Sequence, residues 1–278
     1  MRAGVDAERS LILALGGYAF QFSGGTLVLH ERIAVPRFNF VQVEDLSAER
    51  QTGFFERTLD QYFQRALRPN FRVPIPTPPH IDRTLVGLGF RARTEPLTLL
   101  GRPSESELRR GRPTGEVAHG DAVSTDAIVP FWVGPRERPE LSSAIEIVRH
   151  HPNPKEAFVP LLAREQGVPV AAGLVYAHRG SAFLFGVATT PSARGRGFAT
   201  DLVAWAVSHP PVTKELVVTT LSETRRAERS LRSLGFAPWA RWRVYELDET
   251  AELSLPPTGP SAGPLWRPPR PPRRGRDS

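Results

Sequence analysis

The chain has 278 residues, a length that allows about two domains with separate hydrophobic cores. Hydrophobic residues make up 40% of the sequence and charged residues 23%, and no apolar run approaches the roughly 20 residues that a membrane-spanning helix needs. The formal net charge of +7 lies mainly in a C-terminal tail, which argues against a nucleic-acid-binding folded face, and the absence of cysteine excludes disulfide bonds, thiolate metal sites and a thiol nucleophile.

The first half of the chain predicts alternating helices and strands. An apolar run at 11–20 predicts a core helix that continues into a strand. The elements expected next are a strand at 39–43, a helix at 54–67, a strand at 71–75 and a helix that ends near Leu88. The polar stretch 101–115, which holds two prolines and four arginines, predicts a connection to a second unit.

The second half repeats this order after two further segments. Helices are expected at 122–133 and 141–150, and an antiparallel hairpin at 156–164 and 170–178. The elements expected after the hairpin are a strand at 182–189, a helix at 197–209, a strand at 215–220 and a helix at 224–234. Eight prolines among the last 24 residues preclude regular helix or sheet after Leu255, and the tail also carries five arginines and one aspartate.

A nine-residue repeat links the two halves. The segment 82–90, Asp-Arg-Thr-Leu-Val-Gly-Leu-Gly-Phe, returns 146 positions later at 228–236 with five identities and two conservative exchanges. Each copy predicts the end of a helix, a glycine in the left-handed conformation and a strand that begins with phenylalanine. Because the elements before each copy also follow the same order, we predict two homologous α/β units.

One segment between a strand and a helix has the composition of an anion site. Residues 187–199 read Val-Ala-Thr-Thr-Pro-Ser-Ala-Arg-Gly-Arg-Gly-Phe-Ala. The first N–H groups of a helix lack internal partners and the helix dipole adds positive potential, so a glycine turn at this place allows phosphate oxygens to approach. The segment lacks both the Gly-Lys-Ser/Thr of a nucleotide P-loop and the three-glycine spacing of a dinucleotide fold.

This segment resembles the signature of the GNAT superfamily of acetyl-CoA-dependent N-acetyltransferases, Gln/Arg-x-x-Gly-x-Gly/Ala. Arg194, Gly197 and Ala199 match the signature, and the resemblance covers residues from about 115 to 248. It implies acetyl-CoA as co-substrate, no metal, and a sheet whose fourth strand separates from the fifth to admit the pantetheine arm. The residues that the resemblance places against acetyl-CoA are Val187, Ala188, Thr189, Arg194, Gly195, Arg196, Gly197, Phe198, Ala199 and Thr200.

The sequence departs from the family's usual catalytic pattern. Leu231 stands where the family often has a tyrosine general acid, Thr224 where it often has asparagine, and the fourth strand carries no glutamate. Tyr245, on the strand after the second repeat, and His178, at the end of the third strand, are the candidate catalytic residues, although both residue types are more often packing or surface residues. Proximity and an oxyanion contact from a strand N–H are an alternative that needs neither side chain.

The first unit looks like a degenerate copy of the second. Gly53 and Phe54 align with Gly197 and Phe198, but Phe55 replaces Ala199, and a phenylalanine there is expected to fill the core rather than leave room for a pyrophosphate. We therefore expect an α/β (α+β) fold of two GNAT-like units, each a mixed, largely antiparallel sheet flanked by helices. The expected boundaries are 1–110 for the degenerate unit, 111–250 for the acetyl-CoA-binding unit and 251–278 for the Pro/Arg-rich tail.

The expected function is acetyl transfer from acetyl-CoA to a primary amine by direct attack, in the cytoplasm. The alternative is a non-catalytic acyl-CoA sensor or interaction module, which the missing tyrosine and glutamate motivate. The acceptor is expected to be a small-molecule or peptide amine, with no membrane partner, and nucleic acid is expected at most through the tail. Four acidic residues that flank the predicted helices are candidates for attracting a cationic amine: Asp121, Asp126, Glu137 and Glu140.

Overall fold

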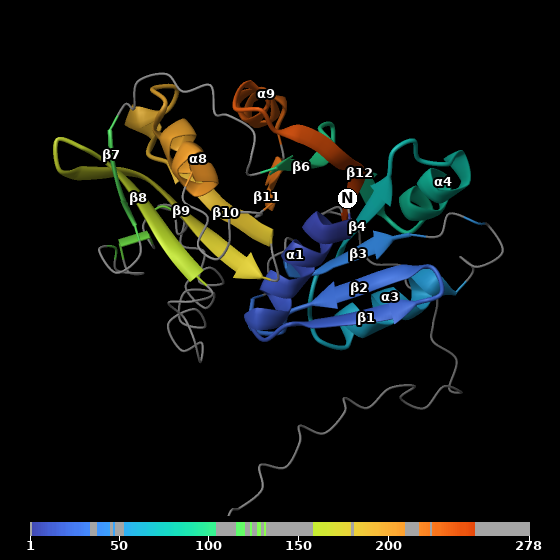
Figure 1. Cartoon of the computed structure of the whole chain (residues 1–278). Helices are drawn as coiled ribbons and strands as arrows, with labels where there is room; N and C mark the ends of the chain where they lie inside the picture. Colours follow the sequence, from blue (N-terminus) through green and yellow to red (C-terminus); the bar gives the residue numbers. More distant parts are fainter. Residues whose placement is uncertain are drawn as a thin grey trace, which may run out of the picture.

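Twelve strands form one continuous sheet in the computed structural model of the chain (Figure 1). The structure describes residues 2–33, 38–44, 47, 53–103, 115–119, 123, 127–128, 131, 158–178, 181–208, 217–222 and 224–247. None of the helices in this part of the chain has the length and apolar character that crossing a membrane requires.

The predicted elements occur in the predicted order, together with three strands, at 25–29, 97–103 and 116–119, that the sequence did not predict. Those of the first half are α1 (Arg2–Ala14), β1 (Tyr18–Phe22), β2 (Gly25–Leu29), β3 (Phe40–Val43), α3 (Phe54–Phe63), β4 (Asn70–Pro74), α4 (Pro79–Gly87), β5 (Phe90–Ala92) and β6 (Leu97–Pro103). Those of the second half are β7 (Glu116–His119), β8 (Phe158–Glu165), β9 (Val168–His178), β10 (Ser181–Thr189), the 3-10 turn η3 (Pro191–Ala193), α8 (Phe198–Ser208), β11 (Val217–Ser222), α9 (Arg225–Ser233) and β12 (Ala237–Leu247).

Local signals explain why these elements begin and end where they do. The side chain of Thr224 caps α9 by accepting a hydrogen bond from the Ala227 N–H at 3.1 Å. The glycine of each repeat copy, Gly89 and Gly235, has φ of +85° and +88°, so both copies turn from helix to strand as predicted. The hairpin of β8 and β9 turns through Gln166 and Gly167, both with positive φ.

The predicted fold class is confirmed, with one local difference. The sheet is mixed, and among the described strands only the pairs β3–β4 and β10–β11 are parallel. The start of the predicted connection is wrong, because residues 101–103 belong to β6, where they pair with β11. The predicted helices at 122–133 and 141–150 lie mostly outside the described residues, and the tail lies entirely outside them.

The strands of the two halves alternate at the centre of the sheet, an arrangement that the sequence did not reveal. The strand order is β1-β2-β3-β4-β12-β6-β11-β10-β9-β8-β7, with β5 also paired to β12. Thus β6 of the first half lies between β11 and β12 of the second half, and β12 lies between β4 and β6 of the first. β6 therefore pairs with β11 of the parallel pair in the second half, and β12 pairs with β4 of the parallel pair in the first.

Helix α1 packs between the two arms of this sheet. In Figure 1 the arm β7–β10 and the arm β1–β4 diverge from the centre, and α1 lies between them, in contact with β9, β10 and β11 as well as β1. Leu11 and Ile12 of α1 enter this core, together with Leu15 directly after the helix. The helices α3, α4, α8 and α9 cover the opposite face of the sheet, where two further cores form.

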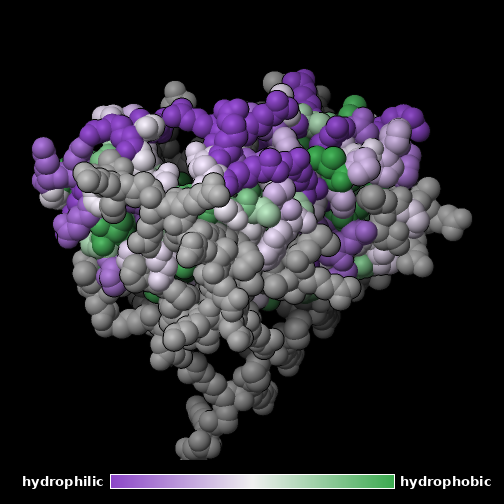
Figure 2. All heavy atoms as spheres, turned by 45° about the horizontal axis from the view of Figure 1, so that its top comes forward, coloured by the Kyte–Doolittle hydropathy of each residue, from purple (hydrophilic) through white to green (hydrophobic). Residues whose placement is uncertain are grey.

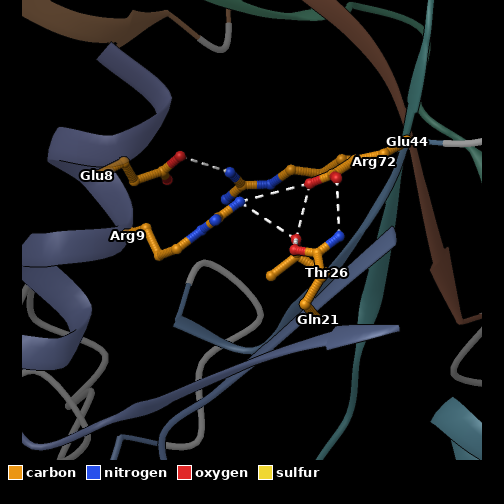
Figure 3. Close-up of polar contacts among 6 residues, drawn as sticks. All are labelled: Glu8, Arg9, Gln21, Thr26, Glu44 and Arg72. Atoms are coloured by element: carbon orange, nitrogen blue, oxygen red, sulfur yellow. Dashed lines mark hydrogen bonds and ion pairs between the residues drawn. The ribbon is translucent and has the colours of Figure 1, made fainter. Parts of the chain in front are cut away.

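A buried ion pair fixes α1 to the first arm. Glu8 on α1 accepts a hydrogen bond from Arg72 on β4 at 2.8 Å, and the two side chains are 6% and 2% exposed. Figure 3 shows this pair beside a second polar group, in which Arg9 of α1 approaches Thr26 and Glu44. Helix α1 is thereby held by charge on one side and by apolar packing on the other.

Candidate functional site

The parallel strands β10 and β11 separate at the place where the sequence predicts a cofactor channel. Their pairing runs from Ser181↔Val217 to Leu184↔Thr220, and in the described residues no further pair follows. Beyond Leu184 the strand β10 continues to Thr189 with a bulge between Phe185 and Ala188, where Gly186 takes a φ of +63°. The last pair is fixed by the buried Thr220 hydroxyl, which donates to the Leu184 carbonyl at 2.9 Å.

The chain beyond β10 forms a glycine loop that leads into α8. Gly195 and Gly197 have φ of +81° and +97°, conformations that side-chain-bearing residues rarely adopt. The first helical hydrogen bond of α8 joins the Asp201 N–H to the Gly197 carbonyl at 3.0 Å. The N–H groups of Phe198, Ala199 and Thr200 precede it and have no acceptor within the helix, so they are available to an anion.

Two contacts fix the start of α8 against β7 and β8. The Asp201 carboxylate accepts a hydrogen bond from the Gly115 N–H at 3.2 Å. A Cβ atom on Gly115 would lie 2.5 Å from the Arg164 carbonyl oxygen and 2.9 Å from the Phe198 ring, so only glycine allows this approach. Phe198 itself is 1% exposed, and its burial anchors the first turn of the helix.

The two arginines of the loop are engaged by the protein. The Nε of Arg194 donates to the Thr189 carbonyl at 3.3 Å, which brings its side chain back toward the end of β10. Arg196 forms a bidentate ion pair with Glu165 at the end of β8, and its guanidinium lies 5.4 Å from the centre of the Phe198 ring. These side chains brace the loop, so its backbone N–H groups are the groups that could hold an anion.

A third arginine, which the sequence analysis did not identify, approaches the loop from α9. The Nη2 atom of Arg226 lies 3.2 Å from the position that a Cβ atom would take on Gly195. Only the separation of β10 from β11 and the placement of α9 bring these residues together, 31 positions apart in the chain. No local motif in the sequence signals this contact, and the same holds for Glu165 as the partner of Arg196.

The predicted cofactor residues form one continuous site. Val187, Ala188 and Thr189 lie on the part of β10 that has left β11, and the stretch from Arg194 to Thr200 forms the loop and first turn that follow. The acidic residues predicted to attract an amine, Asp121, Asp126, Glu137 and Glu140, lie outside the described residues. The part of the chain that is described holds no cluster of three or more histidine and acidic residues of the kind that binds a metal ion.

The structure does not bring Tyr245 to this site. Tyr245 is fully buried in the core of the first half, on β12, which lies three strands from β10 and therefore about 14 Å away. Its hydroxyl donates to Asp82 on α4 at 2.7 Å. Burial, aided by the hydrogen bond to Asp82, raises the pKa of this phenol to about 12.

His178 also lies away from the separated strands. Its backbone pairs with Ser181 at the first residue of β10, whereas Val187 lies six residues further along the strand. At about 3.3 Å per residue this corresponds to about 20 Å. The backbone of His178 therefore lies at the paired end of β10, and Tyr245 lies in the core of the first half.

The corresponding place in the first half is filled. Gly53 precedes α3 with a φ of +83°, as Gly197 precedes α8, but Phe55 in the first turn is 2% exposed and packs edge-on against Phe54 and Phe71. The prediction that Phe55 fills the core is confirmed. The aligned residues at 48–52 lie outside the described part of the chain.

The comparison with protein families identifies the segment that carries this site. Residues 125–236 match the family described as Acetyltransferase (GNAT) family. The match includes β10, the glycine loop, α8 and α9, and it ends at Phe236 of the second repeat copy. No curated protein matches the sequence significantly.

Solved structures with the same fold extend over both halves of the chain. A GCN5-related N-acetyltransferase from Kribbella flavida has a TM-score of 0.60 at 18% identity, covering 89% of this chain and 97% of that one. A functionally unknown conserved protein from Staphylococcus epidermidis has a TM-score of 0.62 at 10% identity, covering 84% and 95%. A GCN5-related N-acetyltransferase from Sphaerobacter thermophilus has a TM-score of 0.54 at 14% identity, covering 80% and 76%. At these identities the likeness is one of fold.

Proposed function

We propose, from the GNAT acetyltransferase domain at residues 125–236, that the chain transfers an acetyl group from acetyl-CoA to a primary amine. The observation that carries this proposal is the separation of β10 from β11 directly before a glycine loop and the free N–H groups of α8. A strand edge with unpaired backbone groups suits the amide-rich pantetheine arm, and the loop suits a pyrophosphate. The residues present therefore fit an acyl-CoA.

Each part of the site has a distinct task in this proposal. Acetyl-CoA, when bound, supplies an activated thioester. Val187 and Thr189 would orient the arm through their backbone groups, and the N–H groups of Phe198, Ala199 and Thr200 would hold the phosphates. A backbone N–H of β10 would stabilise the negative charge that develops on the carbonyl oxygen as a neutral amine attacks. The C–S bond then breaks, CoA leaves as the thiolate, and the proton lost by the amine passes to that thiolate or to solvent. The positions of Tyr245 and His178 favour catalysis by proximity and this contact, without a side-chain acid.

A non-catalytic acyl-CoA sensor is the second candidate function. One observation favours it: Tyr245 is buried in the core of the first half and is not available as a general acid. Leu231, at the position where the family often has a tyrosine, cannot donate a proton either. Measuring free thiol release from acetyl-CoA across a panel of amines separates the two functions. Binding without release above background in every amine supports the sensor, while release that survives Tyr245→Phe and His178→Ala supports catalysis without either residue.

Calorimetric titration of acetyl-CoA tests the shared premise of both functions. We expect one binding site per chain, because Phe55 fills the corresponding place in the first half. A stoichiometry near two contradicts the one-site assignment, and no heat at millimolar ligand contradicts the proposal as a whole.

We also propose that the chain is a tandem of two GNAT-like units, with boundaries near 110 and 250. Its support is internal: each half has one parallel strand pair, a glycine before the following helix and one copy of the nine-residue repeat. The first unit would act as a structural partner of the second. A small-molecule or peptide amine as acceptor and a cytoplasmic location also stay proposals.

A further inference from the structure

Positively polarised groups from two helices approach Gly195: the N-terminus of α8 and the guanidinium of Arg226 on α9. The N-terminus of α8 follows the loop, the N-terminus of α9 begins at Arg225, and the Nη2 atom of Arg226 lies 3.2 Å from the Cβ position of Gly195. An arginine in the first turn of a helix is unfavourable, because the helix dipole places positive potential there. An anion between the loop and α9 would offset this repulsion.

The carboxylates near the start of α9 are committed elsewhere. Glu95, from the loop between β5 and β6, accepts a hydrogen bond from the Arg225 N–H at 2.9 Å. Glu228 contacts Arg232 and Arg241. In the part of the chain that is described, no carboxylate forms an ion pair with Arg226, which is exposed on α9.

The arginines of the loop itself do not take this role. Arg194 bonds to the end of β10 and Arg196 is paired with Glu165, so the guanidinium of Arg226 is the cation left available beside Gly195. The top of Figure 1, which carries α9, comes forward in Figure 2 as a mainly hydrophilic surface. Glycine at position 195 favours the approach of Arg226 for two reasons. A Cβ atom there would strain the backbone at its positive φ, and it would crowd the Arg226 guanidinium.

We propose that Arg226 is a ligand-binding residue of the site and donates to a phosphate group of the bound acyl-CoA. The inference rests on the proposed function and deepens it, because it assigns a side chain from outside the glycine loop to the phosphate site. A guanidinium binds phosphate through two parallel hydrogen bonds, which an exposed lysine or a backbone N–H does not reproduce. The phosphate is either the pyrophosphate or the 3′-phosphate of the nucleotide.

Calorimetric titration of CoA into the full chain tests this assignment. We expect Arg226→Gln to weaken CoA binding about tenfold, the effect of one charge-assisted hydrogen bond, and Arg226→Lys to weaken it less. Arg229→Gln is the matched control, because it removes the same charge from an exposed position of α9 three residues after Arg226. We expect Arg229→Gln to bind CoA within about twofold of the wild type.

A second titration, with 3′-dephospho-CoA, identifies the phosphate. If Arg226 binds the pyrophosphate, Arg226→Gln weakens both ligands equally; if it binds the 3′-phosphate, the loss is confined to CoA. The inference is overturned if Arg226→Gln binds both ligands as tightly as the wild type, or if Arg229→Gln loses as much affinity. Failure of the proposed function gives a different result, since the wild type itself would then bind neither CoA nor acetyl-CoA.

Discussion

At the scale of single residues, two glycines occupy equivalent places with different surroundings. Gly53 and Gly197 each precede a helix with positive φ, and each carbonyl accepts the first helical hydrogen bond, at 3.1 Å and 3.0 Å. Phe55 closes the first turn after Gly53, whereas Ala199 after Gly197 is only partly buried. The backbone conformation is therefore shared, but only at the first place does a buried phenylalanine fill the first turn.

We expect Gly197→Glu to weaken acetyl-CoA binding at least a hundredfold. The new carboxylate would lie within a few ångströms of the phosphates, where like charges repel by about 4 kcal/mol at an effective dielectric constant near 20. Isothermal titration measures the affinity directly. The stabilisation that acetyl-CoA gives the wild type in thermal melting should also be lost in this variant.

Gly53→Glu is the matched control for this prediction. Both substitutions place glutamate at a positive φ, so both should lower stability by about 1–2 kcal/mol without ligand. Only Gly197→Glu should lose the ligand-dependent thermal shift. An equal loss in both variants contradicts the one-site assignment, and an unchanged shift in both removes the anion site from this loop.

His30 is a second residue with a testable role, in stability rather than binding. Its Nε2 donates to the Leu15 carbonyl at 2.8 Å, and its Nδ1 accepts from the Ile33 N–H at 3.2 Å, so the folded state requires the neutral ring. Burial lowers the pKa of His30 from its usual 6.5. The unfolded chain therefore binds a proton at pH values where the folded chain does not.

We expect the free energy of unfolding to fall as the pH drops below about 6.5, because protons then stabilise the unfolded state. For one group the slope approaches about 1.4 kcal/mol per pH unit between the unfolded and folded pKa values. Urea unfolding at a series of pH values measures it. His30→Gln keeps a donor for the Leu15 carbonyl but does not titrate. Below pH 6.5 the free energy of unfolding should therefore fall more steeply with decreasing pH in the wild type than in this variant; equal slopes exclude this role.

Sequence reasoning predicted the local structure of the glycine loop but not the surroundings of Tyr245, for a physical reason. The loop from Arg194 to Thr200 is a local structure whose glycines and helix start are set by neighbouring residues. The environment of Tyr245 depends on which strand pairs with β12, and that partner, β4, lies about 170 residues earlier in the chain. Periodicity and spacing carry no information about such a pairing.

At the scale of elements, the repeat acquires a structural meaning. Its first residues, Asp82 on α4 and Glu228 on α9, are equivalent, and each contacts a strand that crosses from the other half. Asp82 accepts from Tyr245 on β12, and Glu228 accepts from Thr98 on β6 at 3.2 Å. An arginine of β12 also approaches each acid, Arg243 at 3.6 Å in the case of Asp82 and Arg241 in the case of Glu228.

We expect Asp82→Ala and Glu228→Ala each to lower the free energy of unfolding by about 1–2 kcal/mol. Each substitution removes a hydrogen bond to a charged group and leaves the crossing strand with an unpaired hydroxyl. Urea unfolding of the whole chain measures the change. Glu246→Ala is the control, since Glu246 is exposed on β12 and its one ion pair within the described residues is with Arg93, at 3.6 Å, so its loss should cost less than about 0.5 kcal/mol. A cost for Glu246→Ala as large as for the other two contradicts a specific role of the repeat acids.

Most of the elements were predicted from the sequence, but β2, β6 and β7 and the exchange of strands between the halves were not. A strand beginning near the phenylalanine was expected after each copy of the repeat, and β5 and β12 confirm it. Either half could in principle have kept its own strand, because the apolar pattern of β6 suits both neighbours. The choice is made by long-range packing, in which Leu99 joins the core with α1 and Leu100 joins the core with α8.

At the scale of the whole molecule, α1 couples the two arms of the sheet. The Glu8–Arg72 ion pair ties it to β4, and the Tyr176 hydroxyl on β9 donates to the Ser10 carbonyl at 3.3 Å. Burial raises the pKa of Tyr176, which therefore stays a donor at neutral pH. One helix of the first half thus forms part of the core that supports β10.

This arrangement predicts that the two halves stay together after the chain is cut. A protease site placed between residues 104 and 114 separates the elements through β6 from those that follow, without touching a described residue. β6 would remain hydrogen-bonded to β11 through six register pairs and to β12 through five. The buried apolar contacts of α1 with β9 and β10 add to these bonds.

After cleavage we expect one species at the mass of the intact chain in size-exclusion chromatography under native conditions, and a single unfolding transition in urea. Each half expressed alone should be insoluble or unfolded, because the parallel pair β3–β4 would lose β12, and β11 would lose β6. Mixing the two denatured halves and removing the urea should restore the single transition. Separation of the cleaved halves under native conditions, or a cooperative transition in either half alone, would show that the exchanged strands do not join the halves into one folding unit.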